Sequence, residues 1–164
     1  MNRIAQFEKV SYDCFAAGFS GEDPRGTYDR IVLPKRATTG SAGYDFYLTR
    51  DICLKPSETV LIPTGIRARM DEGWVLMLFP RSGLGFKFRL QLNNTVGVID
   101  SDYYYSKNEG HIFCKITNDS KEEKTLELKE GEAFCQGIFL PFGLTIDDDA
   151  AGVRDGGFGS TDGK

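Results

Sequence analysis

The chain has 164 residues, a length that suits one domain able to bury a core without disulfides or metals. Its formal net charge of −4 argues against general nucleic-acid binding, because a protein that binds phosphate backbones needs a basic face. The four cysteines are scattered and only one histidine is present, so zinc is disfavoured and reduced thiols in a cytosolic protein are expected.

Residues 1–30 differ from the rest of the chain in the spacing of their apolar residues and in composition. Their apolar side chains recur at near-helical spacing, at Ile4, Phe7, Val10 and Cys14. Glycine, proline and charge then interrupt this pattern over residues 18–26. We predict a short helix or irregular arm with a linker, packed against the body or a neighbouring subunit. Neither a charged-then-apolar leader nor a long apolar run occurs, so we expect neither secretion nor a membrane span.

From residue 31 onward, short apolar segments alternate with turn signals. Residues 66–70 alternate apolar side chains with arginines, the pattern of a half-buried strand. Residues 74–79 form a continuous apolar run, expected of a strand covered on both faces. Further strands are predicted around 112–116, 126–128 and 138–140. With turns this frequent and no long helical segment, the chain is predicted to be an all-β sandwich or barrel.

The segment 93–103 combines a half-apolar strand with acidic and aromatic side chains. We expect the chain to turn at Gly97 and then to place Asp100 and Asp102 on the same face of an extended strand. Tyr103 follows at once, so the segment suits a polar substrate that carries a ring. Taken alone, the segment is better read as an ordinary hairpin whose Asp and Ser residues satisfy turn backbone.

The composition of the chain changes after Phe142, where the C-terminal tail begins. Three consecutive aspartates precede a segment rich in glycine and poor in aliphatic side chains. Such a segment buries too little surface to order itself, so we expect it to be mobile until a ligand holds it. We therefore divide the chain into an N-terminal arm (1–30), a β body (31–146) and a flexible C-terminal lid (147–164).

Four other segments accompany the hairpin in a characteristic order, at residues 42–45, 80–84, 131–136 and 156–161. Together they closely resemble the motif set of the trimeric dUTP diphosphatases (dUTPases), from about Leu33 to the C-terminus. The resemblance implies a jelly-roll-like β-barrel, a homotrimer with shared active sites, and hydrolysis of dUTP to dUMP and pyrophosphate. That reaction keeps uracil out of DNA and supplies dUMP for thymidylate synthesis.

The resemblance also implies roles for the hairpin. Asp100 matches the catalytic aspartate that activates water, and a carboxylate suits this because it is ionised and accepts protons. Tyr103 matches the tyrosine under the deoxyribose, where its ring excludes a 2′-hydroxyl. Backbone groups of Asn94, Gly97 and Val98 match those that read the uracil edge.

The phosphate side is implied in the same way. Arg81, Ser82 and Gly83 match the motif that holds the phosphate chain, and arginine suits multidentate phosphate contact. Gln136 matches a neutral phosphate-side glutamine. Asp45 matches the acid that holds Mg²⁺ through its waters, and this ion fits because substrate phosphates bind most of it.

The tail completes the implied site. Gly159 and Ser160 match groups that contact the γ-phosphate, and Phe158 would stack on the uracil and close a lid. Arg154 matches the family's tail arginine, although it stands one position closer to Phe158 than the family pattern places it.

A second departure from the family pattern is an insertion at residues 104–109, where the usual arginine after the tyrosine is missing. Whether Lys107 or a tyrosine replaces that contact is open. A dUTPase-like regulator could bind a protein partner through this insertion, although nothing in the sequence indicates one. The nearest enzymatic alternative, dCTP deaminase, is disfavoured because residues 114–118 carry no acidic side chain.

Overall fold

The computed structural model describes residues 2–154, most of whose regular structure is short strands. The strands are β1 (Ala5–Lys9), β2 (Tyr44–Tyr47), β3 (Ile52–Leu54), β4 (Thr59–Pro63), β5 (Ile66–Met70), β6 (Trp74–Pro80), β7 (Leu90–Leu92), β8 (Gly97–Ile99), β9 (Phe113–Asn118), β10 (Leu126–Leu128) and β11 (Ala133–Pro141). The helices are α1 (Tyr12–Gly18), α2 (Pro24–Arg30), α3 (Ser82–Phe88) and the 3-10 helix η1 (Ser101–Tyr105). The predicted all-β class is confirmed. Within residues 2–154, no helix is long and apolar enough to cross a membrane.

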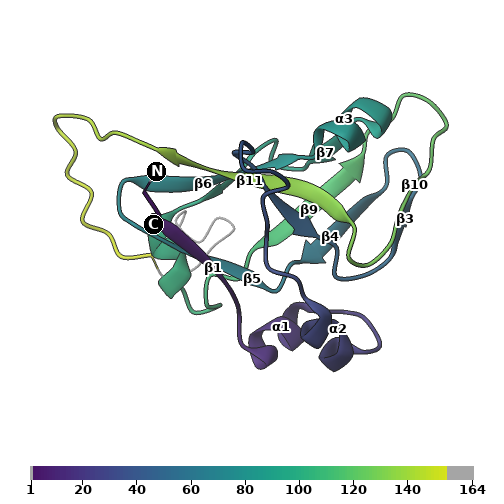
Figure 1. Ribbon diagram of the computed structural model, residues 1–164, viewed down its shortest axis with the longest axis horizontal. Helices are drawn as coiled ribbons and strands as arrows, with labels where there is room; N and C mark the ends of the chain where they lie inside the picture. Colours follow the sequence, from purple (N-terminus) through teal and green to yellow (C-terminus); the bar gives the residue numbers. More distant parts are fainter. Residues whose placement is uncertain (1, 155–164) are drawn as a thin grey trace.

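Antiparallel pairing joins these strands into four sheets. The largest sheet has the order β2-β11-β6-β8, and a three-stranded sheet has the order β4-β9-β7. β1 pairs with β5, and β3 pairs with β10. Figure 1 shows β11 and β6 running side by side, while α1 and α2 lie together at one edge of the molecule. Because β6 pairs with β11 along its whole length, it carries residues to both ends of the central sheet.

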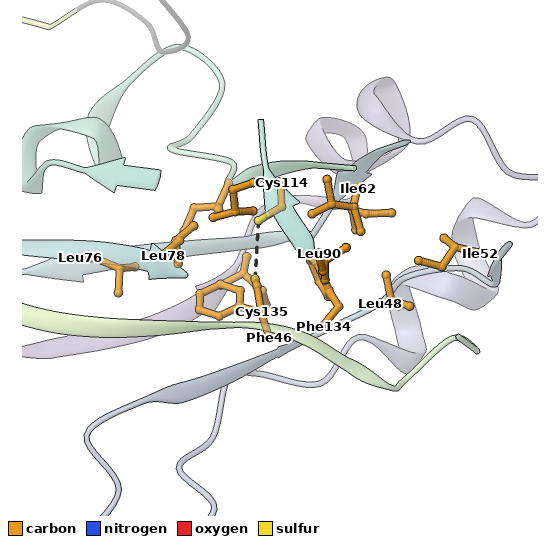
Figure 2. Packing of buried hydrophobic residues seen from close by; sticks show 14 of the residues in the cluster. Phe46, Leu48, Ile52, Ile62, Leu76, Leu78, Leu90, Cys114, Phe134 and Cys135 are labelled. Carbon is orange, nitrogen blue, oxygen red and sulfur yellow. Dashed lines mark hydrogen bonds between the residues drawn. The ribbon is translucent and has the colours of Figure 1, made fainter. Parts of the chain in front are cut away.

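The core is one cluster of buried side chains to which strands of all four sheets contribute, and Figure 2 shows part of it. Cys114 of β9 and Cys135 of β11 meet there, with their sulfur atoms 3.8 Å apart. Both are free cysteines, as are Cys14 and Cys53. Burial raises the pKa of Cys135, so its thiol stays protonated.

The predicted strands of the body are present. β5 buries Ile66, Ala68 and Met70 on one face, as their alternation predicts. β6 differs from the expectation of a strand covered on both faces. Leu76 and Leu78 are buried, whereas the residues between and beside them are only partly buried in the single chain. One face of β6 therefore stays available for a further contact.

The N-terminal arm, predicted as a short helix or an irregular segment with a linker, contains one strand followed by two short helices. Ala5–Lys9 forms β1, which pairs with β5 so that Phe7 lies opposite Ala68. The ring of Phe7 packs against Phe46 at a centroid distance of 5.5 Å, and this packing favours an extended chain over the local helical spacing. The helix begins only after Ser11, whose hydroxyl accepts a hydrogen bond from the backbone N–H of Cys14. The arm packs on the body, as expected.

Candidate active site

The side chains predicted to lie on the phosphate side meet in one cavity of about 380 Å³. Its polar lining includes Asp45, Arg81, Ser82 and Gln136. Sheet pairing brings them together, because Asp45 of β2 lies opposite Gln136 of β11, and Arg81 follows β6 directly. The Nε atom of Arg81 lies 3.4 Å from Oδ1 of Asp45. The cavity thus presents a guanidinium, a hydroxyl and an amide beside one carboxylate, a donor set suited to a polyphosphate.

Two glycines near this cavity differ in the space around them. A Cβ atom at Gly43 would lie 2.5 Å from Oε1 of Gln136. The absence of a side chain at Gly43 therefore leaves the space that the glutamine amide occupies. Gly83 is the second residue of α3, and a Cβ atom there would meet nothing within 4 Å. Of the two, therefore, only Gly43 has a neighbour that an added side chain would displace.

The hairpin turns earlier than the sequence predicted. β7 ends at Leu92, and the left-handed residue of the turn is Thr95, with φ of 67°. Gly97 is the first residue of β8 and lies opposite Leu78 of β6, whose Cβ atom would be 3.0 Å from a Cβ on the glycine. The prediction of a turn at Gly97 was therefore wrong, since this glycine permits close strand packing. Val98 of the same strand is exposed.

Asp100 and Asp102 do not share the face of a strand, which corrects the second prediction for this segment. β8 ends at Ile99, and Asp102 belongs to η1. Their carboxylates nevertheless meet at one partner, because Arg154 donates through Nε to Asp102 at 2.8 Å and through its terminal nitrogen to Asp100. The tail arginine thus lies on the hairpin carboxylates of its own chain.

Tyr103 is buried, with 5 % of its surface exposed. Its hydroxyl donates to the backbone carbonyl of His111 at 2.7 Å and accepts from Nδ2 of Asn108 at 2.8 Å. Burial raises the pKa of the phenol, so the hydroxyl stays protonated and can keep both bonds. The ring is therefore held in a fixed position beside the two carboxylates.

The cavity and the hairpin carboxylates lie at opposite ends of β6. Ile99, just before Asp100, pairs with Leu76, whereas Arg81 follows the other end of the strand. Leu76 and Arg81 are separated by a stretch of extended chain about 16 Å long. In one chain, Asp100 is therefore remote from the phosphate-side cavity.

The insertion after Tyr103 makes contacts that sequence reasoning missed. Tyr104 does not extend into the site, because its hydroxyl donates to Glu8 at 2.8 Å and Arg67 lies over its ring. Tyr105 is exposed. Asn108 bonds to the Tyr103 hydroxyl, a contact that no local sequence pattern signals. Phe158, Gly159 and Ser160, with the predicted lid contacts, lie outside the described residues.

Comparison with known proteins decides the family. The family model described as dUTPase matches residues 29–162. The chain belongs to the dUTPase family. It is 46 % identical over 135 residues to the deoxyuridine 5'-triphosphate nucleotidohydrolase of Lactococcus lactis, a match that covers 80 % of this chain and 88 % of that protein.

Solved dUTPase structures agree with this assignment. The dUTPase from Streptococcus mutans superposes with a TM-score of 0.65 and 40 % identity, over 87 % of this chain and 98 % of that one. A dUTPase variant from phage phi11 of S. aureus gives a TM-score of 0.64 over 92 % of this chain and 98 % of its own, at 20 % identity, and therefore supports the fold alone.

Proposed function

We propose that this chain hydrolyses dUTP to dUMP and pyrophosphate by attack of water on the α-phosphorus. The observation that carries the proposal is family membership, together with relatives named for this reaction. The predicted phosphate-side residues also meet in one cavity, as such a substrate requires. The reaction would remove dUTP before uracil enters DNA and would supply dUMP for thymidylate synthesis.

In the proposed reaction, Asp100 acts as the base. Its carboxylate takes a proton from water while the water oxygen bonds to the α-phosphorus, and the bond from that phosphorus to the bridging oxygen breaks. Pyrophosphate leaves with the bridging oxygen. Tyr103 would lie under the deoxyribose, and the backbone of Asn94, Gly97 and Val98 would select uracil by its donor and acceptor pattern.

Phosphate binding is assigned to the cavity at the other end of β6. Arg81 would neutralise phosphate charge, with Ser82, Gly83 and Gln136 completing the contacts. The described residues contain no group of three or more side chains able to hold a metal ion, and Asp45 is the one carboxylate lining this cavity. This donor set fits Mg²⁺ held mainly by substrate phosphates, which would supply charge neutralisation. The phage phi11 relative is described as coordinating a structural Mg(II) ion.

We further infer a homotrimer in which neighbouring chains complete each site. The separation of Asp100 from Arg81 along β6 supports this, since one chain does not bring both to one substrate. The half-buried face of β6 offers surface for such a contact. In the assembly, Arg154, Phe158, Gly159 and Ser160 would act on the substrate from the tail. The four free cysteines support a cytoplasmic location.

The test is pyrophosphate release from dUTP, UTP, dTTP and dCTP measured side by side with Mg²⁺. We expect release from dUTP alone at an appreciable rate. Ammonia release from dCTP would instead indicate a deaminase, which the strand β9 disfavours because its residues include no acid. Absence of turnover on all four nucleotides would contradict the proposed function.

A further inference from the structure

The N-terminal arm and the insertion after Tyr103 contact each other directly. The hydroxyl of Tyr104 donates to Glu8, the backbone N–H of Ser11 donates to Glu109 at 2.7 Å, and the thiol of Cys14 lies 3.1 Å from the carbonyl of Asn108. Residues almost a hundred positions apart thus form one unit. Through Tyr104 this unit includes part of η1, the helix that also carries Asp102 and Tyr103.

The insertion contains a strained turn that the arm holds. Glu109 has φ of 58° and Gly110 has φ of 70°, so two successive residues lie in the left-handed region. For glutamate this conformation is unfavourable and persists only where surrounding contacts impose it. The carboxylate of Glu109 accepts hydrogen bonds from both the N–H and the hydroxyl of Ser11. Ser11 also caps α1, so the turn is bonded to the start of a helix.

The same turn orients the side chain that bonds to Tyr103. The backbone carbonyl of Asn108 accepts a hydrogen bond from the backbone N–H of His111. The side-chain Oδ1 of Asn108 accepts a second hydrogen bond, from the backbone N–H of Gly110 at 3.3 Å. These bonds close the turn around Asn108 and leave Nδ2 pointing at the phenol oxygen. The path from the arm to the tyrosine therefore runs from Ser11 through Glu109 to Asn108.

We propose that Ser11, Asn108 and Glu109 are positioning residues. They fix the distance between the Tyr103 ring and the deoxyribose and so strengthen selection against a 2′-hydroxyl. The arm thereby becomes a determinant of sugar specificity, although it lies outside the family motifs. This inference rests on the proposed function, in which Tyr103 lies under the deoxyribose. A shift of the ring by a fraction of an ångström would relax a steric exclusion while leaving the uracil and phosphate contacts in place.

The experiment compares kcat/KM for dUTP and for UTP in the full-length protein and in four variants. Ser11→Ala removes the hydroxyl, and Ser11→Thr restores one. Asn108→Asp keeps the shape but removes the donor to the phenol. Glu22→Gln is the control, because this exposed carboxylate belongs to the same N-terminal arm but does not line the cavity between the arm and the insertion. We expect the dUTP preference to fall by about tenfold in Ser11→Ala and Asn108→Asp, and to stay within about twofold of wild type in Ser11→Thr and Glu22→Gln.

The preference ratio separates positioning from simple stabilisation, because loss of folded protein lowers both rates together. An unchanged ratio in Ser11→Ala, with or without a lower Tm, overturns the role of the arm. An unchanged ratio in Asn108→Asp overturns the role of the amide. A wild-type protein that does not hydrolyse dUTP contradicts the proposed function itself, and a wild type that hydrolyses UTP equally well contradicts the role of Tyr103.

Discussion

The guanidinium of Arg154 forms an ion pair with the carboxylate of Asp100 in the same chain. It bonds at the same time to Asp102, and the arginine side chain is only 21 % exposed. The proposed catalytic base is therefore paired with a cation from the tail. In the proposed reaction a water molecule must reach Asp100, so we expect the arginine to exchange this partner for substrate phosphate during turnover.

Asp100→Asn should lower kcat by about a hundredfold or more while changing KM little, because the amide keeps the shape but does not accept the proton of water. Asp102→Asn is the matched control, since this carboxylate binds the same arginine but has no assigned chemical step. Steady-state pyrophosphate release measures both variants. A near-normal kcat in Asp100→Asn would refute the assignment of the base.

Two inactive variants should complement each other if sites are shared. Arg81→Ala removes the phosphate-side cation, and Asp100→Asn removes the base at the other end of β6. With random mixing into trimers, about a quarter of the sites receive an intact copy of each residue from neighbouring chains. Activity should therefore reappear after the two variants are unfolded and refolded together. Mixed trimers demonstrated by mass spectrometry but lacking activity would count against shared sites.

Gly43→Ala should impair catalysis with little loss of stability. The new methyl group would meet the Oε1 atom of Gln136, the flexible end of a side chain that can move away. The glutamine amide would then leave its place in the cavity, so we expect KM for dUTP to rise several-fold while Tm stays nearly constant. Gly40→Ala is the control, because a Cβ atom there meets nothing within 4 Å. Equal KM values in the two variants would contradict the role of Gln136.

His111 should make the fold sensitive to acid. Burial lowers the pKa of its imidazole from 6.5 to about 4, although the nearby Glu109 opposes this shift, and Nε2 accepts a hydrogen bond from the N–H of Gly65 at 2.9 Å. The unfolded state binds the proton more readily, so the free energy of unfolding falls as pH drops from 6.5 towards 4. At neutral pH this residue contributes about 3 kcal/mol to the free energy of unfolding, and that contribution is lost as pH falls through the range from 6.5 to 4.

Urea unfolding at pH 7 and at pH 4.5 measures this effect. His111→Gln, whose side-chain oxygen can accept from Gly65, should lose less stability between the two pH values than the wild type. An equal loss in both proteins would show that other groups cause the acid sensitivity.

The sequence by itself determined the class of fold and the family. Alternating residues such as Ile66 and Met70 specify a strand locally, because side chains two apart share a face of the chain. The motif order was likewise sufficient to predict the dUTPase family and to select Asp45, Arg81 and Gln136, which the structure brings into one cavity. Their chemical roles remain predictions.

Only the tertiary structure decided the rest, because the deciding partners are distant in sequence. Ala5–Lys9 is a strand since it pairs with β5, although its own apolar spacing suggests a helix. Gly97 permits close packing on Leu78, a neighbour that the hairpin sequence does not reveal. The bonds of Ser11 to Glu109 and of Arg154 to Asp100 also span long segments of chain. Local sequence specifies which backbone shape is favourable, whereas long-range pairing selects the side chains that meet.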